Sequence, residues 1–281
     1  MNNLSQILND TTSKIDREMR RYLTLEERRY EYLMESLRYS AYEGGKRIRP
    51  FLTLTFAKAL GGTEEAAFPY AIAVEMIHTY SLIHDDLPCM DNDDYRRGKP
   101  SNHKAFDEAT ALLAGDALLT YGLQIAAENR EAKGTACEAV SLLAASAGFD
   151  GMIGGQMLDL MGEKERLSHD DFLMMNRLKT GCLIRAACLL GCLAAGYSHG
   201  TVLYDAAETY ASAVGLAFQM EDDLLDAGTE DHKTTFLTFL SEKEIREEIA
   251  SLTKQAINAV APFDADGILT AFAEYLSSRT I

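Results

Sequence analysis

Tryptophan is absent from this 281-residue chain, and proline occurs only five times. The alternation of apolar and polar residues that marks strands is also nearly absent. Scarce prolines leave long stretches free to form helices. Apolar residues recur at helical spacing near residues 28–42, 50–60, 66–86, 108–128, 136–160, 170–195, 202–226 and 242–260. We therefore predict an all-α bundle of about ten helices in a single domain, residues 1–281.

Basic residues are scarce as well, because 27 Lys and Arg face 43 Asp and Glu, for a net charge of -16. Such a chain lacks the surplus of positive charge that sequence-independent binding to nucleic acid requires. The first residues show no charged segment followed by an apolar one, and no apolar run is expected to reach the roughly 18 residues that span a bilayer. The sequence predicts a soluble, cytoplasmic protein with no nucleic-acid partner and no membrane span.

Two further absences narrow the chemistry. The chain has neither a GxxxxGK[ST] nor a GxGxxG segment, so a nucleotide ligand is not indicated. Its five cysteines include no CxxC pair, and Cys188 and Cys192 fall one helical turn apart in an apolar run. Free cysteines pack like small hydrophobic residues. We therefore interpret the cysteines as core residues without a metal or redox role.

Two clusters of acidic residues stand out against this background. One runs from Asp85 and Asp86 to Asp91, and the other from Asp222 to Asp226. Each lies in an apolar stretch expected to be helical, so its carboxylates should project from a buried wall. Uncompensated charge there is unfavourable by several kcal/mol unless a cation neutralises it. The paired clusters therefore indicate divalent metal ions, although the first cluster alone also fits a solvated acidic loop.

Helical geometry indicates how each cluster could act. At 100° per residue, Asp222 and Asp226 lie about 40° apart on the helix surface. Asp85 and Asp91 would point about 240° apart on an ideal helix. Pro88 lies between them and should kink or bulge the helix, which would bring Asp91 back beside Asp85.

The few basic residues gather in two segments. Residues 44–50, GGKRIRP, place three cations at the start of an apolar helix, where a helix N-terminus and cations together form an anion site. Residues 93–100, DDYRRGKP, directly follow the first acid cluster. Acidic residues that bind Mg²⁺ beside arginines that bind oxyanions indicate a phosphorylated substrate held partly through metal. The alternative is surface ion pairing of Arg96 and Arg97 with the two aspartates before them.

Taken together, these motifs resemble the trans-isoprenyl (polyprenyl) diphosphate synthase family, and within it the bacterial farnesyl diphosphate synthases. The resemblance extends from about Tyr39 to the C-terminal helix. It rests on the order and spacing of GGKRIRP at 44–50, IHTYSLIHDDLPCMD at 77–91, RRG at 96–98, AGDAL at 114–118, GGQMLD at 154–159, KTG at 179–181 and GLAFQMEDDLLD at 215–226. It implies an isoprenoid-synthase-like helical bundle around a central cavity.

The resemblance also implies head-to-tail prenyl transfer, in which an allylic diphosphate ionises, isopentenyl diphosphate attacks the cation through its double bond, and a proton is lost to the departing diphosphate. The roles implied for matching residues are Asp85, Asp91 and Asp222 as Mg²⁺ ligands supported by Asp86 and Asp226; Lys46, Arg49, His78 and Arg97 for isopentenyl diphosphate; Arg96 for the allylic diphosphate; and Lys179, Thr180 and Gln219 for stabilising the cation. Roughly three Mg²⁺ ions per active site and a homodimer are further implications.

In this family the depth of the cavity sets the length of the product. Tyr80, five residues before Asp85, matches the position whose size forms a floor for the growing chain. An aromatic residue there, together with the inserted Pro88 and Cys89, resembles enzymes that stop at C15. The alternative is that Tyr80 is an ordinary aromatic residue of the core.

Three neighbouring polar residues have two interpretations each. Asp159 either braces the metal site, as the resemblance suggests, or forms an interhelical hydrogen bond. Asp116 lies in an apolar run and is better explained by a buried donor than by substrate. His84 points about 100° away from Asp85 on a helix, so we interpret it as a structural group rather than a ligand.

The chain departs from the family pattern after Asp226, where members continue through a GKxxGKD-like loop. Residues 227–232 contain no lysine, so Lys233 could take over a contact to the allylic diphosphate. Alternative hypotheses are a synthase of geranylgeranyl (C20) or longer products, a noncatalytic subunit with the same fold, and a terpene cyclase. A cyclase would have no use for the cations that match the isopentenyl diphosphate site.

Overall fold

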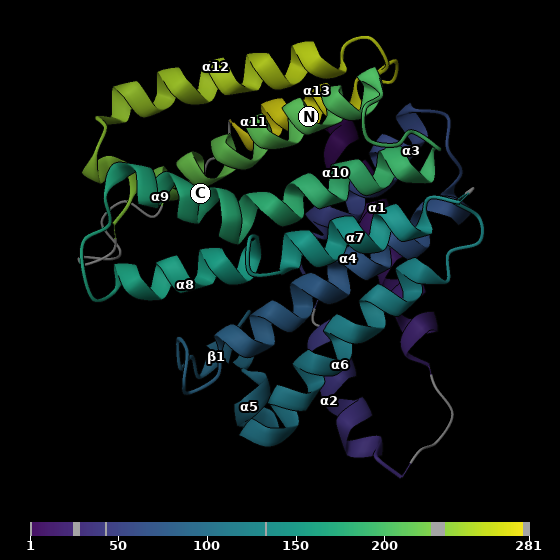
Figure 1. Cartoon of the computed structure of the whole chain (residues 1–281), viewed down its shortest axis with the longest axis vertical. Helices are drawn as coiled ribbons and strands as arrows, with labels where there is room; N and C mark the ends of the chain where they lie inside the picture. The colour runs from purple at the N-terminus through teal and green to yellow at the C-terminus, as the bar shows by residue number, and fades with distance from the viewer. Residues whose placement is uncertain (1, 25–28, 43, 133, 226–233, 278–281) are drawn as a thin grey trace.

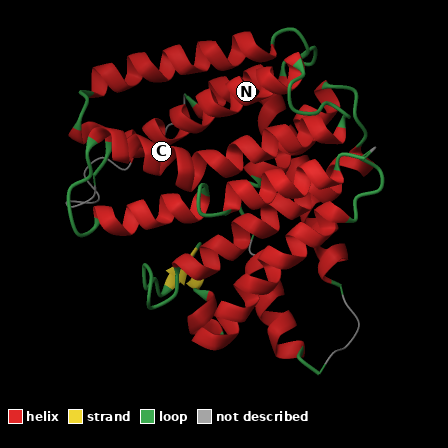
Figure 2. Cartoon of the chain, viewed as in Figure 1, coloured by secondary structure: helices red, strands yellow, loops and turns green. Residues whose placement is uncertain are grey.

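Helices make up most of the computed structural model (Figure 2), which describes residues 2–24, 29–42, 44–132, 134–225 and 234–277. Its α-helices are α1 (Asn2–Leu23), α2 (Glu31–Ala41), α3 (Ile48–Ala59), α4 (Glu64–Asp85), α5 (Asn102–Ala105), α6 (Glu108–Ala127), α7 (Ala136–Ala147), α8 (Met152–Gly162), α9 (His169–Asn176), α10 (Cys182–Ala194), α11 (Val202–Leu225), α12 (Glu242–Val260) and α13 (Ile268–Leu276). The remaining elements are the π-helix η1 (Arg177–Gly181), the 3₁₀-helix η2 (Phe236–Thr238) and the short antiparallel strands β1 (Tyr95–Arg96) and β2 (Lys99–Pro100). The predicted all-α fold is confirmed.

Polar caps fix where several helices begin. The Thr63 hydroxyl accepts a hydrogen bond from the Ala66 N–H at 3.2 Å and so caps α4. Ser241 and Glu244 form a capping box at the start of α12. Such caps satisfy amides that have no partner within the helix. The helix that leads into the first acid cluster therefore starts at a defined residue.

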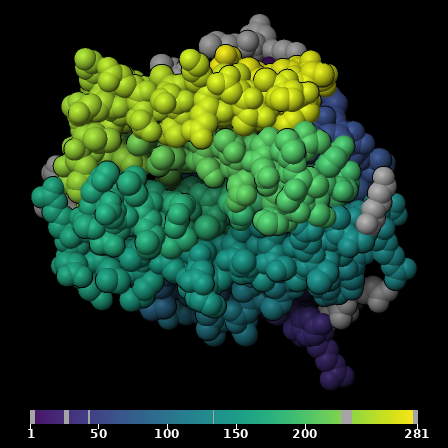
Figure 3. All heavy atoms as spheres, turned by 45° about the horizontal axis from the view of Figure 1, so that its top comes forward, coloured from purple at the N-terminus to yellow at the C-terminus, as the bar shows by residue number. Residues whose placement is uncertain are grey.

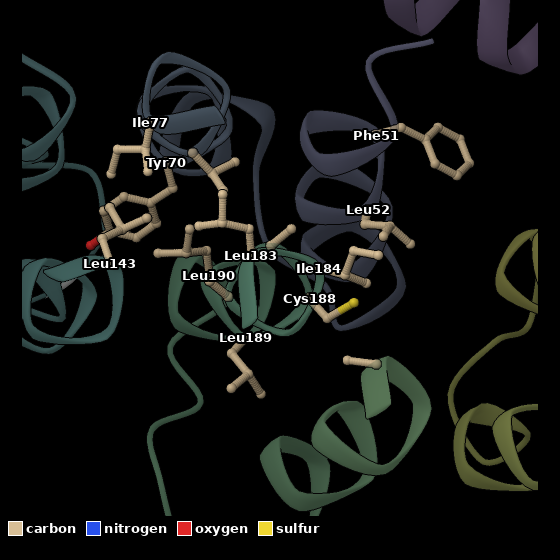
Figure 4. Packing of buried hydrophobic residues seen from close by; sticks show 14 of the residues in the cluster. Phe51, Leu52, Tyr70, Ile77, Leu143, Leu183, Ile184, Cys188, Leu189 and Leu190 are labelled. Atoms are coloured by element: carbon tan, nitrogen blue, oxygen red, sulfur yellow. The ribbon is translucent and has the colours of Figure 1, made fainter. Parts of the chain in front are cut away.

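The core is centred on α4 and α10. Figure 4 shows Leu183 and Leu190 of α10 facing Tyr70 and Ile77 of α4, and none of these four side chains is accessible to solvent. On another side, α10 crosses α3 closely at Gly191, where an added Cβ would lie 2.5 Å from the Cβ of Phe56. Glycine is required at this crossing because any side chain would push the helices apart.

The two acid clusters lie on helices that both pack against α10. Helix α4 carries the first cluster and α11 the second, and each contacts α10 (Figure 1). Helices α12 and α13 cover α11 and form one side of the molecule, yellow-green to yellow in Figure 3. Helix α6 packs against α4, and α8 packs against η1. One central helix thus sets the relative position of both clusters.

The structure divides two stretches that we predicted as single helices. The stretch 136–160 breaks between α7 and α8 at Gly148 and Gly151, where an added Cβ on Gly151 would lie 2.3 Å from the Ser146 carbonyl oxygen. The stretch 170–195 contains α9, the π-helix η1 and α10. Apolar periodicity does not report either interruption, because both flanks of each break remain apolar.

Two segments are longer and more apolar than we expected. Glu108–Ala127 and Ala136–Gly162 both meet the length and composition of a bilayer-spanning helix, although the second is broken between α7 and α8. Only 39% of each segment's apolar window is buried within the chain. Length and composition do not distinguish a membrane helix from an apolar helix that packs on another protein surface.

Candidate active site

The chain turns sharply after α4 and brings the acids of the first cluster together. The helix ends at Asp85, and the N–H of Asp91 returns to donate to the Asp85 carbonyl oxygen at 2.9 Å. The expected approach of Asp91 to Asp85 is therefore seen, but through the end of the helix rather than a kink at Pro88. Burial, countered by Lys179 and reinforced by Asp91, raises the pKa of Asp85 to about 6. A nearby cation would favour its ionised form.

Asp86, the next residue, has a very different environment. Its side chain is buried, and Nε of Arg96 donates to both carboxylate oxygens at 2.7 and 2.8 Å. Burial alone would lower the pKa of Arg96, but the hydrogen bond and charge of Asp86 outweigh it and raise that pKa. Arg96 also lies 3.7 Å from Asp93, as the surface-pairing alternative expected, although its main partner is Asp86.

Arg49, at the start of α3, and His78, on α4, both line a cavity in a region where positive charge is concentrated. The Nε of Arg49 is buried without a hydrogen-bond partner among the described residues, and burial and the charge of Arg97 lower its pKa. Burial, Arg49 and Arg97 hold the pKa of His78 well below its usual value. An anion placed beside Arg49 and Arg97 would relieve the repulsion between their charges, and the neutral imidazole of His78 could donate to it.

Arg97 reaches this group because of two glycines. Its guanidinium donates to the Gly44 carbonyl oxygen. It also packs so closely on Gly45 that a Cβ added there would lie 2.8 Å from Nη1 of Arg97. Both glycines have positive φ, of 76° and 123°. Lys46, on the same loop, is exposed and has no ion-pair partner within the described part of the chain.

Arg47 points the other way and is part of the fold. It lies in the left-handed region with φ of 44°, is buried, and pairs with Asp16 at 2.9 Å and with Glu75 at 2.8 Å. It also donates to the Ala41 carbonyl oxygen at 2.8 Å. Burial would lower its pKa, but the two carboxylates outweigh that effect and raise it. Among the three cations at 46–49, Arg47 is therefore the one whose contacts join α1, α2 and α4.

A cavity of about 590 Å³ connects these groups. Arg49, His78, Asp85, Lys179 and Thr180 lie in its wall. The rest of the lining is mostly apolar: Tyr80, Ser81, Leu82, His84, Leu87, Cys89, Met90, Leu112, Asp116, Leu119, Met152, Ile153, Gln156, Met157 and Leu160. Charged groups at an otherwise apolar cavity are typical of a site for a small amphipathic ligand.

Lys179 and Thr180 lie on the π-helix η1, an element that the sequence did not predict. Lys179 pairs through its ammonium group with Asp159, so the interhelical alternative for that aspartate is seen. The backbone of η1 approaches α8 so closely that a Cβ on Gly155 would lie 2.1 Å from the Lys179 nitrogen. A π-turn shifts the residues after it around the helix axis and is frequent at functional sites. Here it turns Lys179 and Thr180 to the cavity.

The second acid cluster is described only in part. On α11, Asp222 and Gln219 are half-buried, and the Oε1 of Gln219 has no hydrogen-bond partner among the described residues. Asp223 accepts a hydrogen bond from the Phe236 N–H at 2.7 Å and so fixes the start of η2. Asp226 and Lys233, which we predicted as site residues, lie outside the described residues.

The described side chains alone form no metal cage. Within residues 2–225 and 234–277, apart from the gaps given above, no group of three His, Cys, Asp or Glu side chains is close enough to hold a metal ion. The carboxylates nevertheless fit a hard cation, since Asp85 is half-buried close to Asp91, and partial burial raises the pKa of Asp85 to about 6. The predicted metal role of Asp85, Asp86, Asp91 and Asp222 stays a prediction.

Comparison with known proteins agrees with this geometry. The sequence profile of the polyprenyl synthetase family matches residues 30–235. The chain belongs to this family. Membership makes it a prenyltransferase.

Relatives in the family differ in the product that their names record. The chain is 38% identical to a farnesyl diphosphate synthase of Geobacillus stearothermophilus, over 96% of this chain and 95% of that one. It is 38% identical to the large subunit 1 of a heterodimeric geranylgeranyl pyrophosphate synthase of Arabidopsis thaliana, over 87% and 71%. The crystal structure of an FPP/GFPP synthase from Zymomonas mobilis matches with a TM-score of 0.91 and 38% identity, over 98% and 99%.

The sequence did not reveal the contacts of several groups in this site. Gln156 lines the cavity, and its Nε2 is buried with no hydrogen-bond partner in the described structure. The pairing of Arg96 with both carboxylate oxygens of Asp86 was not predicted, although the two residues lie only ten positions apart in the sequence. Nor was the close contact of His84 with Gly115, where an added Cβ would lie 2.1 Å from Nε2.

Proposed function

We propose that this prenyltransferase condenses isopentenyl diphosphate with dimethylallyl or geranyl diphosphate to give farnesyl diphosphate and pyrophosphate. One observation carries the proposal: Arg49 and His78, with their depressed pKa values, and Asp85, with its raised pKa, open into the same apolar cavity. Such a site suits a ligand with an anionic head and a hydrocarbon tail. Farnesyl diphosphate synthases among the relatives support the same reaction.

In this proposal the cationic end holds isopentenyl diphosphate. Lys46, Arg49, His78 and Arg97 donate to its diphosphate oxygens. The orphaned Nε of Arg49 gains the partner that it lacks, and the mutual repulsion of Arg49 and Arg97 is relieved. The depressed pKa keeps His78 neutral before the anion binds, so it can donate one N–H without adding charge.

The acidic end holds the allylic substrate. Asp85, Asp91, Asp222 and Asp226 would hold Mg²⁺, with about three ions per site, and the metal would supply neutralisation of the leaving diphosphate. Asp86 acts through Arg96, whose guanidinium it orients by its two hydrogen bonds. Arg96 and Lys233 then contribute positive charge to the allylic diphosphate.

The remaining residues protect and direct the cation. When the C–O bond of the allylic diphosphate breaks, its electron pair leaves with the diphosphate, and the π electrons of isopentenyl diphosphate form the new C–C bond. The apolar wall excludes the water that would otherwise capture the cation. Thr180, Gln219 and the backbone around Lys179 present oxygen dipoles to it. The diphosphate that has left takes the proton.

We assign the C15 product to the depth of the cavity. Tyr80 lines the cavity and is only 5% exposed, so its ring occupies space that a longer chain would need. Relatives that bear the names of geranylgeranyl and FPP/GFPP synthases keep a C20 or longer product as the second candidate. Tyr80→Ala tests the role of the ring: longer products than those of the wild type are expected, and an unchanged product length would contradict the assignment of Tyr80 as the floor.

We further propose a homodimer. Helix α8 carries Ile153, Met157 and Met161 at helical spacing, exposed by 51, 57 and 37%, and Leu112 and Leu113 of α6 are exposed by 46 and 55%; of these, Ile153, Met157 and Leu112 also line the cavity, so the stripe borders it. An apolar stripe of this kind marks a protein interface. A second copy of the chain would cover it, which also accounts for the low burial of the apolar segment Glu108–Ala127. The single-domain organisation and the cytoplasmic location stay predictions.

Mass spectrometry of the products tests the proposed function. Purified protein is mixed with isopentenyl diphosphate, Mg²⁺ and, separately, C5, C10 and C15 allylic diphosphates. The proposal expects C15 product from the C5 and C10 starters and none in excess chelator. C20 product from every starter would replace the C15 assignment. No condensation with any starter would favour the noncatalytic subunit.

A further inference from the structure

His84 shares the cavity wall with Tyr80, four residues earlier on α4. A spacing of four places both side chains on one face of the helix. Their ring centroids are 5.6 Å apart at an interplanar angle of 80°, so the imidazole meets the phenol edge-on. Aromatic pairs favour this arrangement over a face-to-face stack. The imidazole therefore supports one side of the Tyr80 ring.

Helix α6 holds the imidazole from its other side. The Nε2 of His84 lies 3.0 Å from the Leu112 carbonyl oxygen, which can only accept, so Nε2 is the donor. Gly115 provides the space for this contact. A Cβ at Gly115 would lie 2.1 Å from Nε2 and 2.4 Å from Cδ2, so only glycine admits the ring at this crossing of α4 and α6.

Tyr80 has no comparable anchor of its own. Its hydroxyl is buried and has no hydrogen-bond partner among the described residues. The position of the ring across the cavity therefore depends on packing. Of the neighbours that support it, His84 is itself fixed by a hydrogen bond and by the notch at Gly115.

We propose that His84 is a positioning residue that sets the length of the product. Wedged into the notch at Gly115, it holds the Tyr80 ring across the cavity, and that ring stops the growing prenyl chain. This inference rests on the proposed function and deepens it, because it assigns the stop to three residues on two helices. Without the imidazole, the Tyr80 ring can move toward α6, and the chain can accept another C5 unit.

A double-mutant cycle tests the inference through the ratio of C20 to C15 product, which is independent of overall rate. Wild type, His84→Ala, Tyr80→Ala and the double variant are assayed with isopentenyl diphosphate, Mg²⁺ and a C10 starter. His84→Ala should raise the ratio by about two- to tenfold, the range that corresponds to one edge-on aromatic contact. In the Tyr80→Ala background the same change should add little, because His84 acts through Tyr80.

His199→Ala is a matched control. His199 and Tyr204 form the same kind of edge-on pair, with centroids 5.8 Å apart at 75°, but neither residue lines the cavity. This variant should leave the product ratio unchanged. Gly115→Ala is a second variant, with its substitution on α6 and the sequence of α4 unchanged. Its added methyl group displaces the imidazole, so it should also raise the ratio of C20 to C15 product.

The outcomes separate this inference from the proposed function. If the wild type forms no product with any starter, the proposed function fails. If the wild type makes C15 and both His84→Ala and Gly115→Ala keep its product ratio, the positioning role is overturned while the function stands. An effect of His84→Ala that is undiminished without Tyr80 would also overturn it, because His84 would then act by itself.

Discussion

Arg47 and Arg49 lie two residues apart at the start of α3, yet their charges meet opposite surroundings. Arg47 is buried and donates to Asp16, to Glu75 and to a backbone carbonyl. Arg49 has a buried Nε with no partner among the described residues, and burial lowers its pKa. A cation whose donors already have partners holds the fold together, whereas one with a free buried donor is available to an anion.

The same contrast separates Asp85 from Asp86. Asp86 is 2% exposed and accepts from Arg96 through both oxygens. Asp85 has no ion pair among the described residues, and burial beside Asp91 raises its pKa to about 6. In each pair of neighbours, the charge that is paired within the protein stabilises the structure, and the other charge lies in the cavity wall, where it can meet a ligand.

Replacing Arg47 should have the largest effect on stability. Arg47→Met leaves Glu75 and Asp16 without their cation, and Glu75 is only 3% exposed. Removing one partner of a buried ion pair costs about 3–5 kcal/mol. Urea denaturation should therefore show a loss of unfolding free energy in that range. A loss below about 1 kcal/mol would break the comparison, since Arg47 would then be no more structural than a surface residue.

Replacing Arg49 should change ligand affinity instead. Arg49→Met removes a charged donor to the diphosphate, which corresponds to about 10- to 100-fold weaker binding of inorganic pyrophosphate in calorimetric titration. Its unfolding free energy should stay equal to that of the wild type or rise, because an unpaired buried cation is removed. A stability loss like that of Arg47→Met, with pyrophosphate affinity intact, would contradict the assignment.

Asp85→Asn should stabilise the metal-free protein at neutral pH. The folded-state pKa of about 6 exceeds the ordinary value of 3.8, so the folded wild type binds a proton more tightly than the unfolded chain and loses stability as the pH rises through this interval. Asparagine removes that loss, which amounts to about 1–2 kcal/mol after allowance for partial exposure. Urea denaturation in chelator should show the gain at pH 8 and little of it at pH 4.

An exposed ion pair gives the smallest expected effect. Lys58 and Asp266 lie 2.7 Å apart, but their side chains are 66 and 61% exposed. Lys58→Ala should change the unfolding free energy by no more than about 0.5 kcal/mol. A larger loss would show that ion pairing alone, without burial of the paired charges, is enough to stabilise this fold.

Much of this fold could be predicted from the sequence, because it depends on local patterns. The apolar periodicity near 202–226 predicted α11, observed as Val202–Leu225. The periodicity could not predict the π-helix at Arg177–Gly181, since a π-turn adds a residue without changing which residues are apolar. Nor could it predict the break between α7 and α8, which depends on backbone contacts of glycine.

The candidate site was predictable in its residue types but not in its pairings. The sequence places Asp85, Asp86 and Arg96 near one another. Only the structure shows that Arg96 donates its hydrogen bonds to Asp86 rather than to Asp85. The charges of Arg47 and Arg49 are likewise equal in the sequence. Which of them turns inward depends on Asp16 and Glu75, which belong to other helices. Long-range partners of this kind leave no local signal.

Two-substrate kinetics of Arg49→Met test most directly the claim that the cationic end of the cavity, at Arg49, holds isopentenyl diphosphate and the acidic end, at Asp85, holds the allylic substrate. The account predicts that KM for isopentenyl diphosphate rises about tenfold or more, while KM for geranyl diphosphate changes less than about twofold. An equal rise in both, or a rise for geranyl diphosphate alone, would contradict it.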